Sequence, residues 1–230
     1  MKLMHPWFQR PVLFSENRIQ VLAIENRGLF SRMVSELCAQ SEGEKGGFVL
    51  SEEDALLECA SCLDVILDFF HLSPDRKRLQ ARFQAKMKAA AQQELQLETA
   101  AMQAHLQEYL RQIMALFDYP AEVEQEGDIG AILKACGPRL SFDGANTAEN
   151  LLDYMAVRQD LGGVRCFVLV NLKSYLAGNE LQLFYEGICD RKLHVLLLES
   201  DQRETASEKE NIRLIDKDFC ELFLANGGEV

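Results

Sequence analysis

Charged side chains gather in two neighbouring runs of this chain, one basic and one acidic. Between Pro74 and Ala90 there are six bases and one acid, Asp75. Beyond Pro120 every second residue is a carboxylate, namely Glu122, Glu124, Glu126 and Asp128. The first run has the chemistry of a phosphate-binding surface, and the second has that of a site for a hard divalent cation.

The basic run comprises Arg76, Lys77, Arg78, Arg82, Lys86 and Lys88. In a helix, Arg78, Arg82 and Lys86 recur every four residues and share one face. A row of cations about 6 Å apart can bind a nucleic-acid backbone without reading its bases. A solvated helix face is the alternative, although such faces usually alternate in sign and no acid lies between Arg76 and Glu94. Lys134 and Arg139 are further candidates for phosphate contacts.

The four alternating acids would point to one side of an extended segment. Like charges stacked so closely are unfavourable unless solvent or a cation relieves them. Carboxylate oxygens suit calcium or magnesium, although the pattern is not that of an EF-hand loop. A solvated acidic loop explains the spacing equally well.

Other candidate sites are weaker. Residues 24–31 lie where a nucleotide-binding α/β fold has its phosphate loop, but they contain one glycine, Gly28, and Arg32 follows Ser31. A working loop needs closely spaced glycines and a Lys-Ser/Thr pair, so we do not expect nucleotide binding. Cys59 and Cys62 have no second pair with zinc-site spacing, which favours a place in the core. The sequence shows no catalytic constellation.

The overall composition agrees with a reduced, cytoplasmic protein. The chain has 230 residues and a formal net charge of −12, which taken alone argues against nucleic acid, so the uneven distribution of charge is the informative feature. No apolar run approaches the ~20 residues of a membrane helix, and the N-terminus lacks an apolar signal region. Most of the seven cysteines lie in apolar runs, as expected of reduced core residues.

The elements that must position these charges follow an α/β pattern. Continuous apolar strands are predicted at 19–25, 165–170, 194–198 and 211–215, which is typical of a parallel sheet covered on both faces. Helices are predicted at 29–39, 129–136, 147–159, 178–189 and near 219–224. Residues 48–50 predict a short strand, and Ser51 begins either a second helix or an extended segment.

The basic run belongs to a long helical stretch, residues 73–117, without glycine and with a single proline, Pro74. Its apolar face shifts register between 79/83/87 and 102/106/109/113, which predicts a break near Gln92–Gln96. We therefore predict a discontinuous α/β head, residues 1–70 and 130–230, with an inserted helical leg at 71–129 that carries the acidic segment.

Several segments, in this order, resemble the Csn-two family of type II-A CRISPR adaptation proteins. They are residues 21–32, 166–176, 194–203 and 212–221, with Val-Asn-Leu-Lys-Ser-Tyr-Leu at 170–176 and Leu-Leu-Leu-Glu-Ser at 196–200 as the most specific parts. The resemblance implies a mostly parallel sheet head related to P-loop or RecA-like cores, with a degenerate nucleotide site, and a helical leg.

The resemblance also implies a function. Members of that family form a homotetrameric ring whose basic inner wall encircles the end of double-stranded DNA without sequence preference during spacer acquisition. Bound calcium stabilises the DNA-binding arrangement, and the proteins act with the adaptation integrase and the effector nuclease without being enzymes themselves. By this resemblance the basic run would face the DNA, and the acids at 122–128 would hold calcium.

Two different functions remain open from the residues alone. One is a divalent-metal-dependent nuclease or NTPase that uses the acids at 122–128. The other is a protein-interaction scaffold whose basic face binds an acidic partner.

Overall fold

The computed structural model describes residues 1–53, 55–72, 76–122, 127–142, 144, 146–176, 178–202 and 207–224, and of Arg76 only the backbone. Its contacts divide the chain into two compact units. The head unit is Met1–Ser73 with Phe142–Val230, and the helical unit is Pro74–Ser141. The second division therefore falls after residue 141, whereas the sequence analysis places it after 129.

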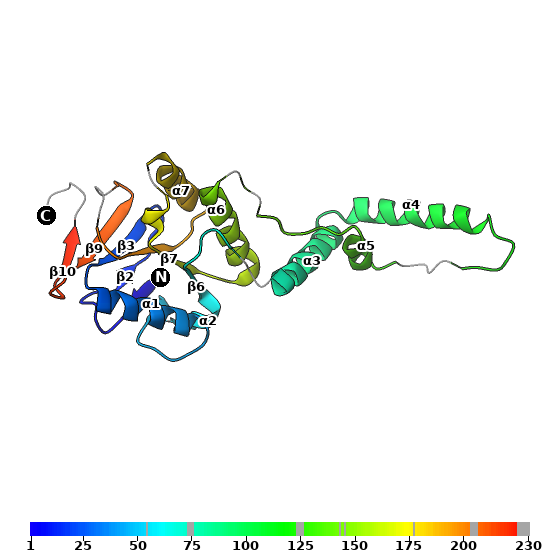
Figure 1. Ribbon diagram of the computed structural model, residues 1–230. Coiled ribbons are helices and arrows are strands. Elements are labelled where there is room, and N and C mark those ends of the chain that lie inside the picture. The colour runs from blue at the N-terminus through cyan, green and yellow to red at the C-terminus, as the bar shows by residue number, and fades with distance from the viewer. Residues whose placement is uncertain are drawn as a thin grey trace. The chain divides into compact units, whose positions relative to one another are not determined.

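The head unit has a βα architecture with two sheets (Figure 1). Its strands are β1 (Lys2–Met4), β2 (Val12–Leu13), β3 (Ile19–Ile24), β4 (Val49–Glu52), β5 (Ala55–Leu57), β6 (Leu63–Ile66), β7 (Cys166–Val170), β8 (Val195–Glu199), β9 (Glu210–Ile215) and β10 (Glu221–Leu224). Its helices are α1 (Arg27–Ser41), α2 (Cys59–Cys62), α6 (Thr147–Val157) and α7 (Asn179–Asp190), with a π-helical turn at Arg158–Gly162 and a 3-10 turn at Leu172–Ser174.

The larger sheet has the strand order β10-β9-β3-β8-β7-β6. The five strands from β9 to β6 run parallel, and β10 is antiparallel to β9. The predicted strands at 19–25, 165–170, 194–198 and 211–215 are confirmed as β3, β7, β8 and β9. The chain is thus a mixed α/β protein with a mostly parallel sheet, as the continuous apolar strands predict.

Both faces of this sheet are buried. Successive side chains of a strand alternate between the faces, so each strand contributes to two cores. Helices α6 and α7 cover one face, and α1 with the small sheet covers the other (Figure 1). Along β7, Phe167 and Leu169 join the first core, whereas Cys166, Val168 and Val170 join the second. The thiol of Cys166 is fully buried, and burial raises its pKa, as expected of a core cysteine.

The small antiparallel sheet has the order β2-β1-β4-β5. Of the two alternatives for the stretch after Ser51, the extended one holds, because Leu50–Glu52 pairs with Ala55–Leu57 as a hairpin. Strands β1, β5 and β6 are not predicted by the sequence pattern. These strands have three or four residues each, too few for apolar periodicity to separate them from loops.

The predicted terminal helix near 219–224 is wrong, because the structure has strand β10 there. A tight turn precedes it, in which Asp216 Oδ1 accepts hydrogen bonds from the backbone N–H groups of Asp218 (2.9 Å) and Cys220 (2.8 Å). Phe219 takes a left-handed conformation, with φ of 66°. An aspartate whose side chain accepts hydrogen bonds from the following backbone N–H groups is typical of a turn. Asp216 was therefore the residue that indicated a hairpin in place of a helix.

The helical unit contains α3 (Arg76–Gln93), α4 (Gln96–Met114) and α5 (Ile129–Ala135). The predicted break near Gln92–Gln96 is confirmed. Leu95 leaves helical geometry (φ −115°, ψ 39°), and the Thr99 hydroxyl donates to the Ala91 carbonyl oxygen at 2.8 Å across the elbow. Within the described ranges of both units, no helix is long and apolar enough to cross a membrane.

A buried polar cluster joins the turn after β7 to the end of β8, the start of β9 and helix α7. The backbone N–H of Lys173 donates to Glu199 Oε1 (3.2 Å), and the Lys173 ammonium lies 2.8 Å from Glu210 Oε1. The hydroxyl of Tyr185 also donates to Glu210. Burial is the main reason that the pKa of Glu199 rises to about 7, against the opposing hydrogen bond from Lys173.

This shifted group predicts a pH dependence of head-unit stability. A carboxyl whose pKa is higher in the folded than in the unfolded chain stabilises the fold below about pH 4.5, and this contribution is lost as the pH rises through about 7. Relative to Glu199→Gln, the wild type should therefore lose up to about 3 kcal/mol of unfolding free energy over that interval.

Urea titrations at several pH values, followed by the fluorescence of Trp7 in the head unit, would measure the difference. The exposed Glu180→Gln variant in α7 serves as control and should track the wild type. A difference between wild type and Glu199→Gln that does not vary with pH would contradict the prediction.

Candidate functional site

The packing of α3 within the helical unit decides where its basic side chains lie. Leu79 is 1% exposed, and α5 packs along α3. Arg78, Arg82 and Lys86 line the flank beside the row of Leu79, and their side chains are exposed. The spacing of four is thus retained in one continuous helix, which also carries the exposed Lys77. The side chain of Arg76 lies outside the described residues.

A side-chain clamp holds the segment that follows α5 against α3. Gln80 Nε2 donates to the Pro138 carbonyl oxygen (2.7 Å), and its Oε1 accepts from the Leu140 backbone N–H (3.2 Å). Arg139 lies between these two anchors and is exposed. Lys134 is exposed in the last turn of α5. All eight predicted phosphate-binding residues therefore belong to the helical unit.

The structure pairs Lys88 with a predicted metal ligand. Its ammonium lies 2.7 Å from Asp128 Oδ1, and both side chains are partly exposed. Asp128 also caps α5, since the same oxygen accepts from the Gly130 backbone N–H at 3.0 Å. The hydrogen bond from Lys88, followed by that from Gly130, lowers the pKa of Asp128. No sequence pattern predicts that these two candidates meet.

The other predicted metal ligands are only partly visible. Glu122 is exposed at the end of a described stretch, and Glu124 and Glu126 lie outside the described residues. In the part of the chain that the structure describes, no three His, Cys, Asp or Glu side chains gather closely enough to hold a metal ion. The predicted alignment of all four acids on one side thus remains a prediction.

A polar cavity of about 600 Å³ opens beside Asp128 at the α3–α4 elbow. Its polar lining consists of Gln92, Gln96, Thr99, Gln103, Gly127 and Asp128. The Gln103 amide donates to the Gly127 carbonyl oxygen at 2.8 Å, which holds this backbone beside α4. Amide, carbonyl and carboxylate oxygens are the donors that hard cations prefer. Asp128 is the one carboxylate of this lining, and the Lys88 ammonium already pairs with it.

The uncharged polar side chains that line this cavity were not predicted from the sequence. The three glutamines and Thr99 lie around the predicted helix break, and glutamine is common on solvated helices. Only their concentration near the register shift indicated a shared cavity. A break between two helices brings the end of the first and the start of the second close together, so that their side chains can line one cavity.

A short turn with a helix cap occupies the expected position of a phosphate loop in the head unit. Only Glu25 and Asn26 separate β3 from α1, and the Asn26 side chain accepts from the Leu29 backbone N–H at 3.0 Å. Across the sheet, Asn171 follows β7, and its side-chain oxygen accepts from the Ser200 backbone N–H at 2.8 Å. Both polar side chains thus hold the ends of strands, where a nucleotide-binding fold would present groups to phosphates and metal.

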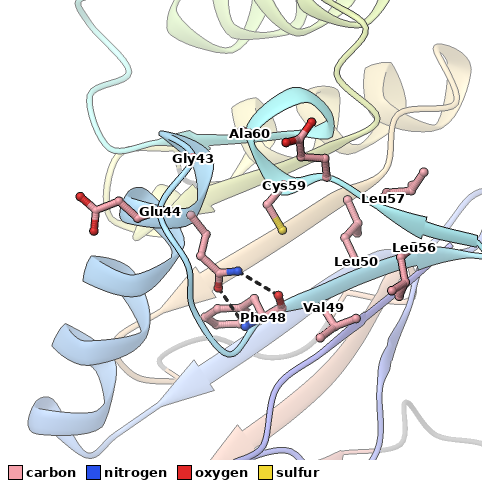
Figure 2. A pocket seen from close by; sticks show the side chains of 11 residues that line it. Gly43, Glu44, Phe48, Val49, Leu50, Leu56, Leu57, Cys59 and Ala60 are labelled. Carbon is pink, nitrogen blue, oxygen red and sulfur yellow. Dashed lines mark hydrogen bonds between the residues drawn. The ribbon is translucent and has the colours of Figure 1, made fainter.

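A second cavity, of about 240 Å³, lies in the head unit between the end of α1, the β4–β5 hairpin and α2 (Figure 2). The Gln40 side chain spans it, accepting from the Phe48 N–H (2.8 Å) and donating to the Phe48 carbonyl oxygen (3.0 Å). Cys59 lies in its wall among Phe48 and Leu50, and burial raises the pKa of the thiol. This placement agrees with a core role for Cys59.

Comparison with known proteins identifies a family. No curated protein matches the chain. A solved structure described as a putative ABC transporter (ATP-binding protein) from Pyrococcus furiosus aligns with a TM-score of 0.39 and 11% identity, over 92% of this chain and 97% of that chain. So low a score does not establish a shared fold.

The profile of a family described as CRISPR-associated protein (Cas_Csn2) matches residues 40–219. The match runs from the end of α1 to the turn before β10, and so includes the whole helical unit and most of the head unit. Because it spans most of the chain, the protein belongs to the Cas_Csn2 family of CRISPR-associated proteins.

Proposed function

We propose that this protein binds the ends of double-stranded DNA during CRISPR spacer acquisition, without sequence preference and without cleaving the DNA. The observation that carries the proposal is the exposed row of Arg78, Arg82 and Lys86 on one continuous helix of a chain with a net charge of −12. Concentrating cations on one element lets an acidic protein attract a polyanion locally while its remaining surface stays repulsive.

The arrangement favours contact with the DNA backbone over base readout. A single row of arginine and lysine side chains matches the regular negative charge of phosphates, and guanidinium groups bind phosphate oxygens in a fixed geometry. No second basic helix that could enter the major groove occurs in the described part of the helical unit. Sequence-independent binding follows from contacts of this kind.

We further infer that four copies form a ring with the basic rows turned inward. This fits α4, which has no buried residue in the part of the chain that the structure describes. Its apolar stripe consists of Met102, Leu106, Tyr109, Leu110 and Ile113, and the first four are at least 36% exposed. Such stripes are rarely left in water by a monomer, and a second copy would cover them.

Calcium has a structural place in this proposal. Glu122, Glu124, Glu126 and Asp128 would hold it beside the oxygen-lined cavity at the α3–α4 elbow. When bound, calcium would offset the repulsion among these carboxylates, so that the segment can lie against the elbow. The head unit then serves as a scaffold, because the cap at Asn26 closes its phosphate-loop position. The adaptation integrase and the effector nuclease are the partners that the family implies.

DNA topology tests the ring directly. A ring that threads onto ends should bind a linear duplex more tightly than the same sequence as a closed circle, and both DNAs should remain intact with calcium or magnesium present. Gel shifts with matched linear and circular molecules give both results. Equal affinities would contradict the ring, and metal-dependent cleavage would instead support a nuclease.

The basic row has its own test. Replacing Arg78, Arg82 and Lys86 together by alanine should weaken DNA binding and flatten the dependence of log K on log salt by up to three phosphate contacts, ~0.9 each. Fluorescence anisotropy at several salt concentrations measures the slope. A control with Lys2, Arg27 and Lys217 replaced by alanine makes the same charge change at exposed head-unit positions. If both triple variants behave alike, only net charge matters and the DNA lies elsewhere.

The metal is tested by removal and by substitution. Chelation of calcium should weaken DNA binding, and the double variant Glu124→Gln with Asp128→Asn should reproduce the loss in the presence of calcium. Asparagine is preferable to alanine at 128 because it can still cap α5, and loss of that cap would cost about 1 kcal/mol by itself. Calcium-dependent binding that persists in the double variant would place the metal elsewhere.

A further inference from the structure

The small sheet of the head unit ends in an open edge. Strand β5 is its last strand and pairs on one side with β4, so its outer edge is unpaired within that sheet. Among the described residues, no hydrogen bond joins the backbone of β5 to a segment other than β4. Alternate residues of an edge strand direct their N–H and C=O groups outward, where a further strand can bind them.

The side chains of β5 leave this edge accessible. Natural edge strands usually carry a lysine, a proline or a bulge that blocks a further strand. The sequence of β5 is Ala-Leu-Leu, and its pairing with β4 has no bulge. Leu56 is 78% exposed and Val49 of β4 is 45% exposed, so apolar surface lies at the open edge (Figure 2). The three-residue length of β5 limits a bound partner to a short segment.

The head-unit cavity of about 240 Å³ adjoins this edge and can receive a side chain. Leu56 and Leu57 of β5 form part of its wall, together with Phe48 and Leu50 (Figure 2). Its volume is below the range of ordinary small-molecule sites, about 300–1,000 Å³. The cavity therefore suits one aliphatic side chain of a neighbouring strand better than a separate ligand.

Carboxylates surround the same edge. From Glu42 to Cys62 the sequence has six acids and one base, Lys45. Glu44 and Glu58 belong to the cavity wall and are exposed, and neither carboxylate has an ion-pair partner within the part of the chain that the structure describes. Such a rim repels nucleic acid and attracts lysine or arginine. Pairing with a second copy would bring two acidic rims together, so a different, basic protein fits this edge.

We propose that the outer edge of β5 binds an extended, basic segment of a partner protein, which adds a strand to the small sheet. An apolar side chain of that segment enters the cavity. Lysine or arginine two positions before and after it points to the same face, toward Glu44 and Glu58. Backbone hydrogen bonds supply affinity, and this spacing supplies specificity. The site lies in the head unit and does not depend on the proposed DNA binding by the helical unit.

A synthetic peptide tests strand addition on the full-length protein. The probe is fluorescein-labelled Thr-Lys-Thr-Leu-Thr-Lys-Thr, and its binding is measured by fluorescence anisotropy. A matched peptide with alternate backbone amides N-methylated keeps the side chains and the charge but cannot complete a β-ladder. The wild type should bind the probe at least about tenfold more tightly than the matched peptide. Equal affinities, or no binding of either peptide, would overturn the proposal.

One pair of variants locates the probe. Leu56→Gln should weaken probe binding about tenfold, because it removes apolar contact at the edge of β5 without changing the charge. Leu97→Gln makes the same change in α4, where Leu97 is 82% exposed, and should leave the affinity unchanged. Circular dichroism melts verify that both variants remain folded. Equal affinities of the two variants would place the peptide elsewhere and overturn the proposal.

A second pair of variants tests the acidic rim. Glu44→Gln with Glu58→Gln should weaken probe binding about fivefold, as expected for two partly solvated ion pairs. Glu180→Gln with Glu208→Gln makes the same charge change at exposed positions of the head unit and should alter the affinity less than twofold. Equal losses in both double variants would mean that the peptide responds to net charge alone, against the proposed site.

Hydrogen exchange gives the structural readout. Added probe should slow amide exchange in β5 and leave exchange in α7 unchanged, because only the edge strand gains hydrogen bonds. Mass spectrometry of proteolytic fragments resolves the two elements. Exchange in β5 that stays the same with saturating probe would overturn strand addition even if the peptide binds.

Discussion

The packing of α5 on α3 is the constraint on which the helical unit depends. α3 is a charged helix with little apolar surface, and Leu79 is its one fully buried side chain among the residues described. Gln80 adds a two-ended clamp to Pro138 and Leu140, and Lys88 adds an ion pair to Asp128. These contacts are spread around about half of the helix circumference. They use its apolar and amide groups for folding and leave the arginine row outside the packed face.

In the head unit, polar side chains at the ends of strands also serve the fold, because they form hydrogen bonds with backbone groups. Asn26 caps α1, Asn171 ties β7 to the residue after β8, and Glu199 is bound by the backbone of Lys173. In a nucleotide-binding relative of such a sheet, this edge would be open to ligand. Here its polar side chains are engaged with backbone groups, which suits a unit that positions another part of the protein.

The long, strongly patterned elements could be predicted from the sequence, and the short ones could not. The continuous apolar strands such as Cys166–Val170 specified the parallel sheet, and the register shift specified the elbow between α3 and α4. The hairpin ending in β10 depended on the backbone conformation around Asp216, which apolar periodicity does not report. In the candidate site the basic row could be predicted from spacing alone. The Lys88–Asp128 pair joins residues forty positions apart, and the oxygen-lined cavity depends on how the elbow closes, so both required the tertiary structure.

Gly130 carries a consequence for the evolution of the family. A Cβ atom at this position would lie 2.9 Å from Lys88 Cδ and 3.3 Å from both Asp128 carboxylate oxygens, so the three positions constrain one another. A relative with alanine at the position of Gly130 would gain helix propensity but would have to lose or redirect the lysine. Positions 88, 128 and 130 should therefore covary within the family.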